Sequence, residues 1–206
     1  MNKKIRILIP LALLFIMLAV AGTDAAKKES KQQARGQASM DILANWPDAS
    51  KRAANEVMNK YGQPDGVTNN WLVWQNKGPW REIMVYREEI QHNFPKEHKD
   101  VLEQTIAFKV PADRFSDLAE FDGSLIAERT KGILSARCDS EAMNFLALNL
   151  ANDIVNDRAS VDEARQRFAQ IAQDFLAGKK HPYTQGFQFQ VARAEQTRDP
   201  DESLIG

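Results

Sequence analysis

Residues 138–157, CDSEAMNFLALNLANDIVND, decide how the rest of the chain is organised. Apolar residues recur here at helical spacing, which predicts one continuous apolar stripe on a helix; they are Met143, Ala147, Leu150 and Ile154. Neighbouring apolar residues widen this stripe to about 200° of the circumference at about 100° per residue. A helix this apolar is predicted to be the central one and to be packed on more than one side.

The remaining face of the predicted central helix is polar and carries Asn149, Asn152, Asp153 and Asn156. Asparagine is a poor helix former, so its repeated use on one face needs a reason. The face is expected either to be solvated or to contact a neighbouring loop or a ligand.

Length and composition fit one globular domain with a leader. The chain has 206 residues, of which 43% are hydrophobic, so a packed core does not require disulfides or metals. Removing the three basic residues and the one acidic residue of the leader, residues 1–26, leaves 24 basic and 27 acidic residues, a net charge of −3. Nucleic-acid binders carry basic stripes, so no nucleic-acid partner is expected.

The first 26 residues have the pattern of a signal peptide. A cationic start, MNKKIR, precedes the uncharged run 7–22, and residues 19–21 form an A-x-A cleavage pattern. The run is shorter than the about 20 residues of a membrane-spanning helix, and Pro10 interrupts it. The sequence therefore predicts export to the periplasm or the extracellular space, with membrane contact only through the leader. An uncleaved leader that anchors an envelope protein is the alternative.

Local patterns divide the rest of the chain into three segments. Residues 27–40 are polar and aperiodic, which predicts a disordered spacer. Residues 41–194 are predicted to form the globular domain, and residues 195–206 a polar, frayed tail.

The domain is predicted to contain helices and short-turn hairpins. Turn, cap and alternation signals predict helices at 47–61, 111–123 and 160–178, strands at 70–75, 80–86, 102–110, 125–129, 133–137 and 187–191, and an irregular connection at 87–100. Short turns imply antiparallel pairing. The predicted fold class is α+β, a single domain with a mostly antiparallel sheet, helices packed on one face, and an N-terminal signal helix before it.

Residues 59–86, NKYGQPDGVTNNWLVWQNKGPWREIMVY, carry a family resemblance. The order helix, Gly62-x-Pro64 and Trp-bearing hairpin resembles a module of the β-lactamase-inhibitor-like fold, which outer-membrane assembly lipoproteins also use. No cysteine stands beside the leader, so the chain departs from the lipoprotein pattern. Taken whole, the chain resembles exported bacterial proteins with no assigned activity, which implies a compartment but no reaction.

His92, His98 and Asp100 lie in the polar connection and could ligate zinc. Their spacing is neither that of a helix nor that of a zinc knuckle, so it favours a solvated loop. The third histidine, His181, lies in a distant loop. The sequence therefore predicts no metal and no cofactor, and a hydrolase-like or metal-binding enzyme using residues 87–100 is the alternative function.

Cys138, the only cysteine, stands at the start of the predicted central helix. A helix N-terminus lowers the pKa of a thiol and could make it a nucleophile, but the adjacent Asp139 opposes this. Cysteine is among the most buried residue types, which favours a core position.

Three tryptophans surround one predicted turn, and they are Trp71, Trp74 and Trp80. Tryptophan is enriched at interfaces, but it also packs across strands. Trp71 and Trp74 point to opposite faces of a regular strand, so at least one is expected to be exposed or covered by the 87–100 connection through Phe94. These three tryptophans and Phe94 are the candidate binding surface.

The leading functional hypothesis is a non-enzymatic exported protein that binds an unknown protein or small ligand in the cell envelope. The chain contains no Gly-rich phosphate loop, no G-x-S-x-G elbow and no CxxC pair, which leaves no enzyme motif to favour.

The leader pattern yields the first testable prediction. The exported protein is expected to begin between Gly22 and Lys28, because the cleavage pattern at residues 19–21 ends just before this range and a second candidate, residues 23–25, lies within it. Mass spectrometry of the exported form measures this directly, and an intact Met1 would contradict cleavage.

Overall fold

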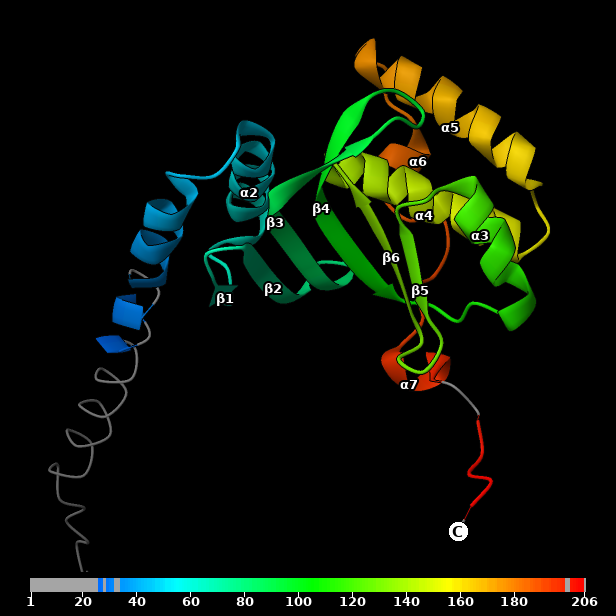
Figure 1. Ribbon diagram of the computed structural model, residues 1–206, viewed down its shortest axis with the longest axis horizontal. Coiled ribbons are helices and arrows are strands. Elements are labelled where there is room, and N and C mark those ends of the chain that lie inside the picture. The colour runs from blue at the N-terminus through cyan, green and yellow to red at the C-terminus, as the bar shows by residue number, and fades with distance from the viewer. Residues whose placement is uncertain (1–25, 28, 32–33, 199–200, 206) are drawn as a thin grey trace, which may run out of the picture.

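The computed structural model describes residues 26–27, 29–31, 34–198 and 201–205 of the chain. The predicted signal peptide falls almost entirely on residues 1–25, which lie outside the described residues. The described chain forms one antiparallel sheet with helices on it, so the α+β single-domain prediction is confirmed (Figure 1). Among these residues, no helix combines the length and the apolar character needed to cross a membrane.

The sheet has six strands in the order β1-β2-β3-β4-β6-β5, and each neighbouring pair is antiparallel. The strands are β1 Gly66–Val67, β2 Trp71–Lys77, β3 Trp80–His92, β4 His98–Ala107, β5 Leu125–Glu128 and β6 Ile133–Cys138. Both predicted hairpins, β2–β3 and β5–β6, are present, and short connections join their strands as the turn residues indicate.

Helices cover one face of this sheet, where α2 and α4 contact the central strands and α5 packs outside α4 (Figure 1). The helices are α2 Asp48–Tyr61, the 3-10 turn η1 Ala112–Arg114, α3 Phe115–Phe121, α4 Glu141–Val155, α5 Val161–Leu176, α6 Pro182–Gln185 and α7 Ala194–Thr197. Predicted end signals act as expected, because Gly62 ends α2 at φ 82° and Ser160 forms a capping box with Glu163.

Helix α4 is the central helix, and every residue from Met143 to Ile154 is buried. Most of its polar face is not solvated: Asn149, Asn152 and Asp153 are buried, and Asn156 alone of the four is exposed. Asn149 holds the segment that follows α6. The Asn149 amide donates to the Gly186 carbonyl at 2.9 Å, and its oxygen accepts from the Gln188 N–H at 2.8 Å. The Asn149 side chain therefore supplies hydrogen bonds that a neighbouring strand would otherwise supply.

That arrangement corrects the prediction of a strand at 187–191, since this segment is irregular. Its alternating phenylalanines pack against other aromatic rings, and the segment is not hydrogen-bonded into the sheet. The Phe187 ring lies 5.1 Å from Trp80 and 4.9 Å from Phe145, and Phe189 lies 5.8 Å from Phe108. Alternation of apolar residues does not distinguish a strand from an irregular segment held by aromatic packing.

Both ends of the domain are more ordered than the sequence predicts. Residues 34–43 are helical, although the sequence predicts a disordered spacer up to residue 40, and Ser39 within them is buried. At the other end, α7 begins the predicted frayed tail and buries Thr197. Gly132, in the β5–β6 turn, has φ 62° and lies close to the end of α7. A Cβ at this position would be 2.0 Å from the Thr197 carbonyl oxygen.

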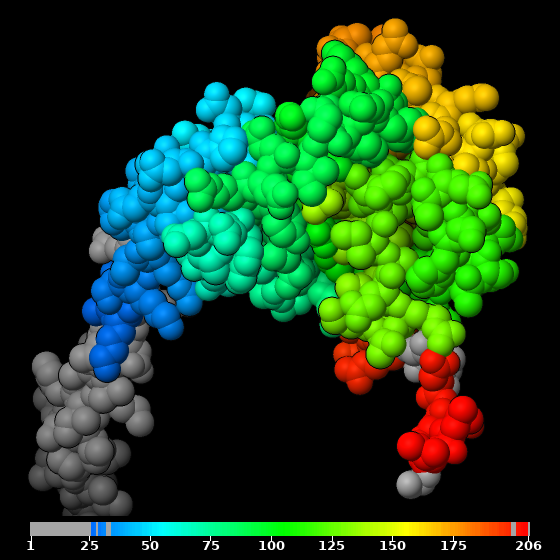
Figure 2. Space-filling model, viewed as in Figure 1, coloured from blue at the N-terminus to red at the C-terminus, as the bar shows by residue number. Residues whose placement is uncertain are grey.

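The predicted irregular connection at 87–100 is wrong, because most of these residues continue strands β3 and β4. A register shift separates the two halves of this hairpin: residues 86–89 of β3 lie opposite Val101 alone. Such a bulge bends a strand. The hairpin tip beyond it lies against α5 (Figure 2), where the Phe94 ring is 5.3 Å from Phe168.

The carboxylate of Glu141, at the first turn of α4, connects the helices to the sheet. Lys60 donates to Oε2, and three groups donate to Oε1: the hydroxyl of Tyr61, the indole of Trp80 at 2.7 Å and the amide of Gln104 at 3.3 Å. Burial favours the protonated form, but the hydrogen bonds from Lys60, Tyr61 and Trp80 outweigh it and lower the pKa of Glu141. Elements α2, β3 and β4 are thereby held to the start of α4.

Replacing Leu150 by alanine is expected to destabilise the protein by about 2–5 kcal/mol, because Leu150 is fully buried in the core. Urea unfolding measures this loss. Leu204→Ala is the matched control, because Leu204 is 99% exposed. Equal midpoints for the two variants would contradict the central position of α4.

Replacing Glu141 by glutamine is expected to lower stability at neutral pH by about 1.5–3 kcal/mol, the range for hydrogen bonds to a charged group. The folded-state pKa of Glu141 lies below its ordinary value of 4.5. Its carboxylate therefore stabilises the fold above that value, and the benefit is lost as pH falls through the lowered pKa. The difference between wild type and Glu141→Gln should shrink in acid, whereas Glu202→Gln, on the exposed tail, should differ little at any pH. A stability difference between wild type and Glu141→Gln that grows as the pH falls would contradict this role of the carboxylate.

Candidate metal centre

His92 and His98 are direct cross-strand partners at the tip of the β3–β4 hairpin. Cross-strand partners share a face, and Asp100 lies two residues beyond His98 on β4, so it shares that face as well. The spacing His-x5-His-x-Asp is therefore that of three side chains gathered at one end of an antiparallel ladder. The sequence concealed this because residues 93–97 are a turn within one hairpin and not part of a long loop.

The carboxylate of Asp100 lies between the two imidazoles. Its Oδ1 is 3.0 Å from His98 Nε2, and its Oδ2 is 3.3 Å from His92 Nδ1. One ligand atom from each of the three residues lies within 4.8 Å of the other two. Tetrahedral zinc with bonds of about 2.0–2.1 Å places its ligand atoms about 3.3 Å apart. Each imidazole lies near that separation from an Asp100 oxygen, although His98 faces Oδ1 and His92 faces Oδ2.

Asp100 is 1% exposed, and within the described residues its Oδ1 has no partner that satisfies hydrogen-bond geometry. The Ser124 hydroxyl donates to the other oxygen, Oδ2. Oδ1 lies 3.0 Å from His98 Nε2, and this contact is an ion pair when the imidazole is protonated. A buried carboxylate oxygen without a donor is costly, and a metal ion between these atoms would remove that cost.

The orientation of the His98 ring is that of a metal ligand. Its Nδ1 is 2.8 Å from the Lys96 carbonyl, which only accepts, so Nδ1 carries a hydrogen. Nε2 then faces Asp100 Oδ1 and the sulfur of Cys138, which is 3.3 Å away. Metal-bound histidines commonly donate their second N–H to a carbonyl in this way. A Cys-His-Asp catalytic relay needs both ring nitrogens, so this arrangement does not form one.

Burial and neighbouring charges shift the pKa values of His98 and Asp100. Burial disfavours a charged His98, but Asp100, the Lys96 carbonyl and Asp139 outweigh it and raise the pKa of His98. Burial likewise opposes ionisation of Asp100, but His98, Ser124 and His92 outweigh it and lower the pKa of this carboxyl. Together these shifts describe an ionised Asp100 carboxylate that stabilises a positive charge on the His98 imidazole.

Further acidic groups surround the two imidazoles. Asp122 accepts the Ser124 N–H at 2.9 Å and lies 3.7 Å from His92 Nε2. Burial raises the pKa of Asp122, and burial with the carboxylates of Asp139 and Asp100 raises that of the Cys138 thiol well above its usual range. The local field of these groups favours a positive ion.

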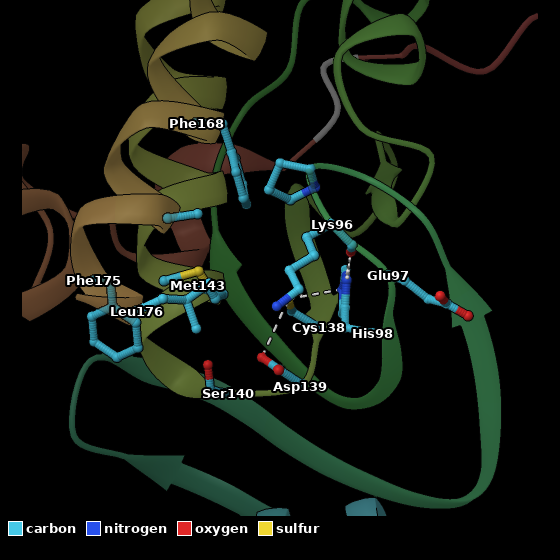
Figure 3. A pocket seen from close by; sticks show the side chains of 12 residues that line it. Lys96, Glu97, His98, Cys138, Asp139, Ser140, Met143, Phe168, Phe175 and Leu176 are labelled. Atoms are coloured by element: carbon cyan, nitrogen blue, oxygen red, sulfur yellow. Dashed lines mark hydrogen bonds between the residues drawn. The ribbon is translucent and has the colours of Figure 1, made fainter. Parts of the chain in front are cut away.

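A pocket of about 180 Å³ opens beside this cluster (Figure 3). His98, Cys138 and Asp139 line its polar side, and Glu97 points away from it. Its apolar side is formed by Met143, Phe168, Ala172, Phe175 and Leu176. Cys138 therefore lies between the histidine cluster and the pocket.

The candidate binding surface is wrong for two of its four residues. Trp74 and Trp80 are buried, and their indoles donate to the Gly62 carbonyl at 2.8 Å and to Glu141 at 2.7 Å. Trp80 also packs on α4, and not on the face of Met84 and Tyr86 that regular alternation would assign to it.

The other two candidate residues lie far apart in the fold. Trp71 is half-buried opposite Tyr86 on β3. Phe94 is half-buried at the hairpin tip, where the Arg165 guanidinium lies 3.9 Å from its ring. The four residues therefore do not form one surface.

Sequence reasoning missed the contributions of Asp122 and Ser124, and the approach of Cys138 to His98. Asp122 and Ser124 follow α3, and only the packing of the hairpin tip brings them to Asp100. A usable signal existed in the histidines alone, because residues separated by a five-residue turn can pair across a hairpin.

Comparison of the chain with protein-family models, with curated proteins and with solved structures found no match. The resemblance to the β-lactamase-inhibitor-like module stays a prediction.

Proposed function

We propose that this protein is an exported metal-binding protein whose centre is formed by His92, His98 and Asp100. The observation that carries the proposal is the buried Asp100 Oδ1, which faces an imidazole nitrogen at 3.0 Å and has no partner of hydrogen-bond geometry in the described part of the chain. Three ligand atoms within 4.8 Å of one another support the same reading. The leading sequence hypothesis named an unknown protein or small ligand in the cell envelope and no metal, so a bound ion is a new candidate for that ligand.

The ligand types favour a zinc-class ion. Two imidazole nitrogens suit zinc, copper, nickel or iron, whereas calcium and magnesium prefer oxygen ligands throughout. The Lys96 carbonyl supplies the outer contact that fixes the His98 ring. The signal-like leader supports a compartment outside the cytoplasm, where the ion would be captured.

A metal-dependent hydrolase is the second candidate function. The observation in its favour is the pocket that shares His98 with the cluster. Zinc with three protein ligands leaves one position for water, which the ion activates for attack on an ester or amide. In this reading the apolar wall holds the non-reacting part of the substrate.

Metal binding is tested by titrating zinc into protein purified from cells that express the full chain. One bound ion per chain is expected by calorimetry and by elemental analysis. His92→Ala, His98→Ala and Asp100→Asn should each weaken binding at least about tenfold, because each removes a ligand. Urea midpoints and circular dichroism are measured alongside to show that each variant is folded.

His181→Ala is the matched control, because His181 is the third histidine of the chain and instead accepts the Tyr183 N–H at 3.2 Å. Zinc binding that is lost equally in the control, or absent in the wild type, would refute the proposal. Hydrolysis of activated esters by the zinc-loaded wild type, abolished in His98→Ala, would favour the second candidate.

A further inference from the structure

We infer that the pocket between α4, α5 and the tip of the β3–β4 hairpin binds a free α-amino acid with an apolar side chain. This inference goes beyond metal binding and does not depend on it, because the pocket shares only His98 with the three candidate metal ligands. The apolar lining, the volume and the charges of the pocket together select this class of ligand.

The wall of the pocket is apolar, and part of it is open to solvent. Side chains of α4 and α5 form it, and they are Met143, Phe168, Ala172, Phe175 and Leu176. Phe175 and Leu176 stay exposed in the last turn of α5, although Phe168 on the same helix is buried. In Figure 3 these apolar side chains lie across the hollow from Lys96. An apolar wall that faces a few polar groups is typical of a small-molecule site.

The volume of the pocket, about 180 Å³, limits the apolar part of the ligand to one small group. An apolar cavity of about 150 Å³ holds one benzene molecule. Drug-sized ligands occupy pockets of about 300–1,000 Å³. The wall therefore suits a single side chain such as that of leucine or phenylalanine, and it is too small for a long lipid chain or a peptide segment.

Two opposite charges flank the apolar wall. The Lys96 ammonium belongs to the hairpin tip and the Asp139 carboxylate precedes α4, and both residues line the pocket (Figure 3). Among the described residues neither forms an ion pair, and Asp139 accepts the weak S–H donor of Cys138 at 3.8 Å. Glu97 points away from the pocket. A ligand with both a carboxylate and an ammonium group complements Lys96 and Asp139, whereas an ion of one sign would be repelled by one of them.

The start of α4 supports the position of the ligand carboxylate. Ser140, the N-cap residue of α4, lines the pocket, and its side chain makes no capping hydrogen bond. The first N–H groups of a helix lack partners within the helix, and the helix dipole favours negative charge there. A carboxylate between Lys96 and this helix end has donors on two sides, while the ligand ammonium faces Asp139. The side chain on the α-carbon then reaches the apolar wall.

Calorimetric titration of L-leucine and L-phenylalanine into protein purified from cells that express the full chain tests the inference. Both are expected to bind at one site per chain. Glycine and L-serine, which lack an apolar side chain, should bind at least about tenfold more weakly. Isocaproate and isoamylamine, which are leucine without its amino group and without its carboxylate, should bind at least about tenfold more weakly as well. Equal affinity for leucine and either analogue would overturn the zwitterionic class, and no binding of leucine or phenylalanine would overturn the site.

Variants identify the charges that hold the ligand. Lys96→Gln and Asp139→Asn should each weaken leucine binding at least about tenfold, because each removes one charged partner. Glu97→Gln is the matched control, because Glu97 is the neighbour of Lys96 but points away from the pocket. Urea midpoints show that each variant is folded. An equal loss in the control, or unchanged leucine affinity in the other two variants, would refute the assigned contacts.

Titrations of zinc-free and zinc-loaded protein separate this inference from the proposed metal site. Leucine binding by the zinc-free protein would support the pocket even where no metal binds. A protein that binds zinc but neither leucine nor phenylalanine would refute the amino-acid site and leave His92, His98 and Asp100 as metal ligands.

Discussion

The carboxylate of Glu141 is the contact on which the relation between helices and sheet depends. It stands at the first turn of α4, where the helix dipole favours negative charge, and it accepts hydrogen bonds from α2, β3 and β4. Below it, the Asn144 amide donates to the Leu102 carbonyl of β4 at 3.0 Å. These polar contacts fix where α4 begins on the sheet, and the buried apolar residues of α4 then extend the interface. The position of Cys138, just before α4, follows from the same constraint.

The bulge in β3 is the second determinant of the site. Its extra residues are held from outside the hairpin, because the Arg87 N–H donates to the Asn70 carbonyl at 2.8 Å and Glu89 accepts from the first turn of α2. The bulge redirects the hairpin tip, where Phe94 packs between Phe168 and the Arg165 guanidinium. The two histidines thus lie over Asp122, Ser124 and the end of β6. An unbent hairpin would leave the same histidines without these neighbours.

The histidine cluster is a better candidate functional site than the tryptophan hairpin, because the two differ in whether their buried polar atoms have hydrogen-bond partners. The indoles of Trp74 and Trp80 have their hydrogen-bond partners within the fold, and their rings are buried. Asp100 is equally buried, yet among the described residues one of its oxygens has no partner of hydrogen-bond geometry. A buried, ionised carboxylate in that state supports the proposal of a bound cation. The two imidazoles beside it favour a zinc-class ion over calcium or magnesium in that proposal.

Local sequence patterns determined the element types, and tertiary structure determined how the elements meet. The apolar stripe of α4, the capping box at Ser160 and the turn of φ 82° at Gly62 involve residues within a few positions of one another, so they are visible in the sequence. The three ligand candidates were visible only as residue types in a segment taken for a loop. Their convergence depends on the β3–β4 register and on the bulge in β3. Contacts with α2 and with the β1–β2 connection support that bulge. Similarly, alternation at 187–191 did not distinguish a strand from aromatic packing, because Asn149 of α4 supplies the hydrogen bonds that decide between them. Such contacts join residues far apart in the chain, and only the folded structure brings them together.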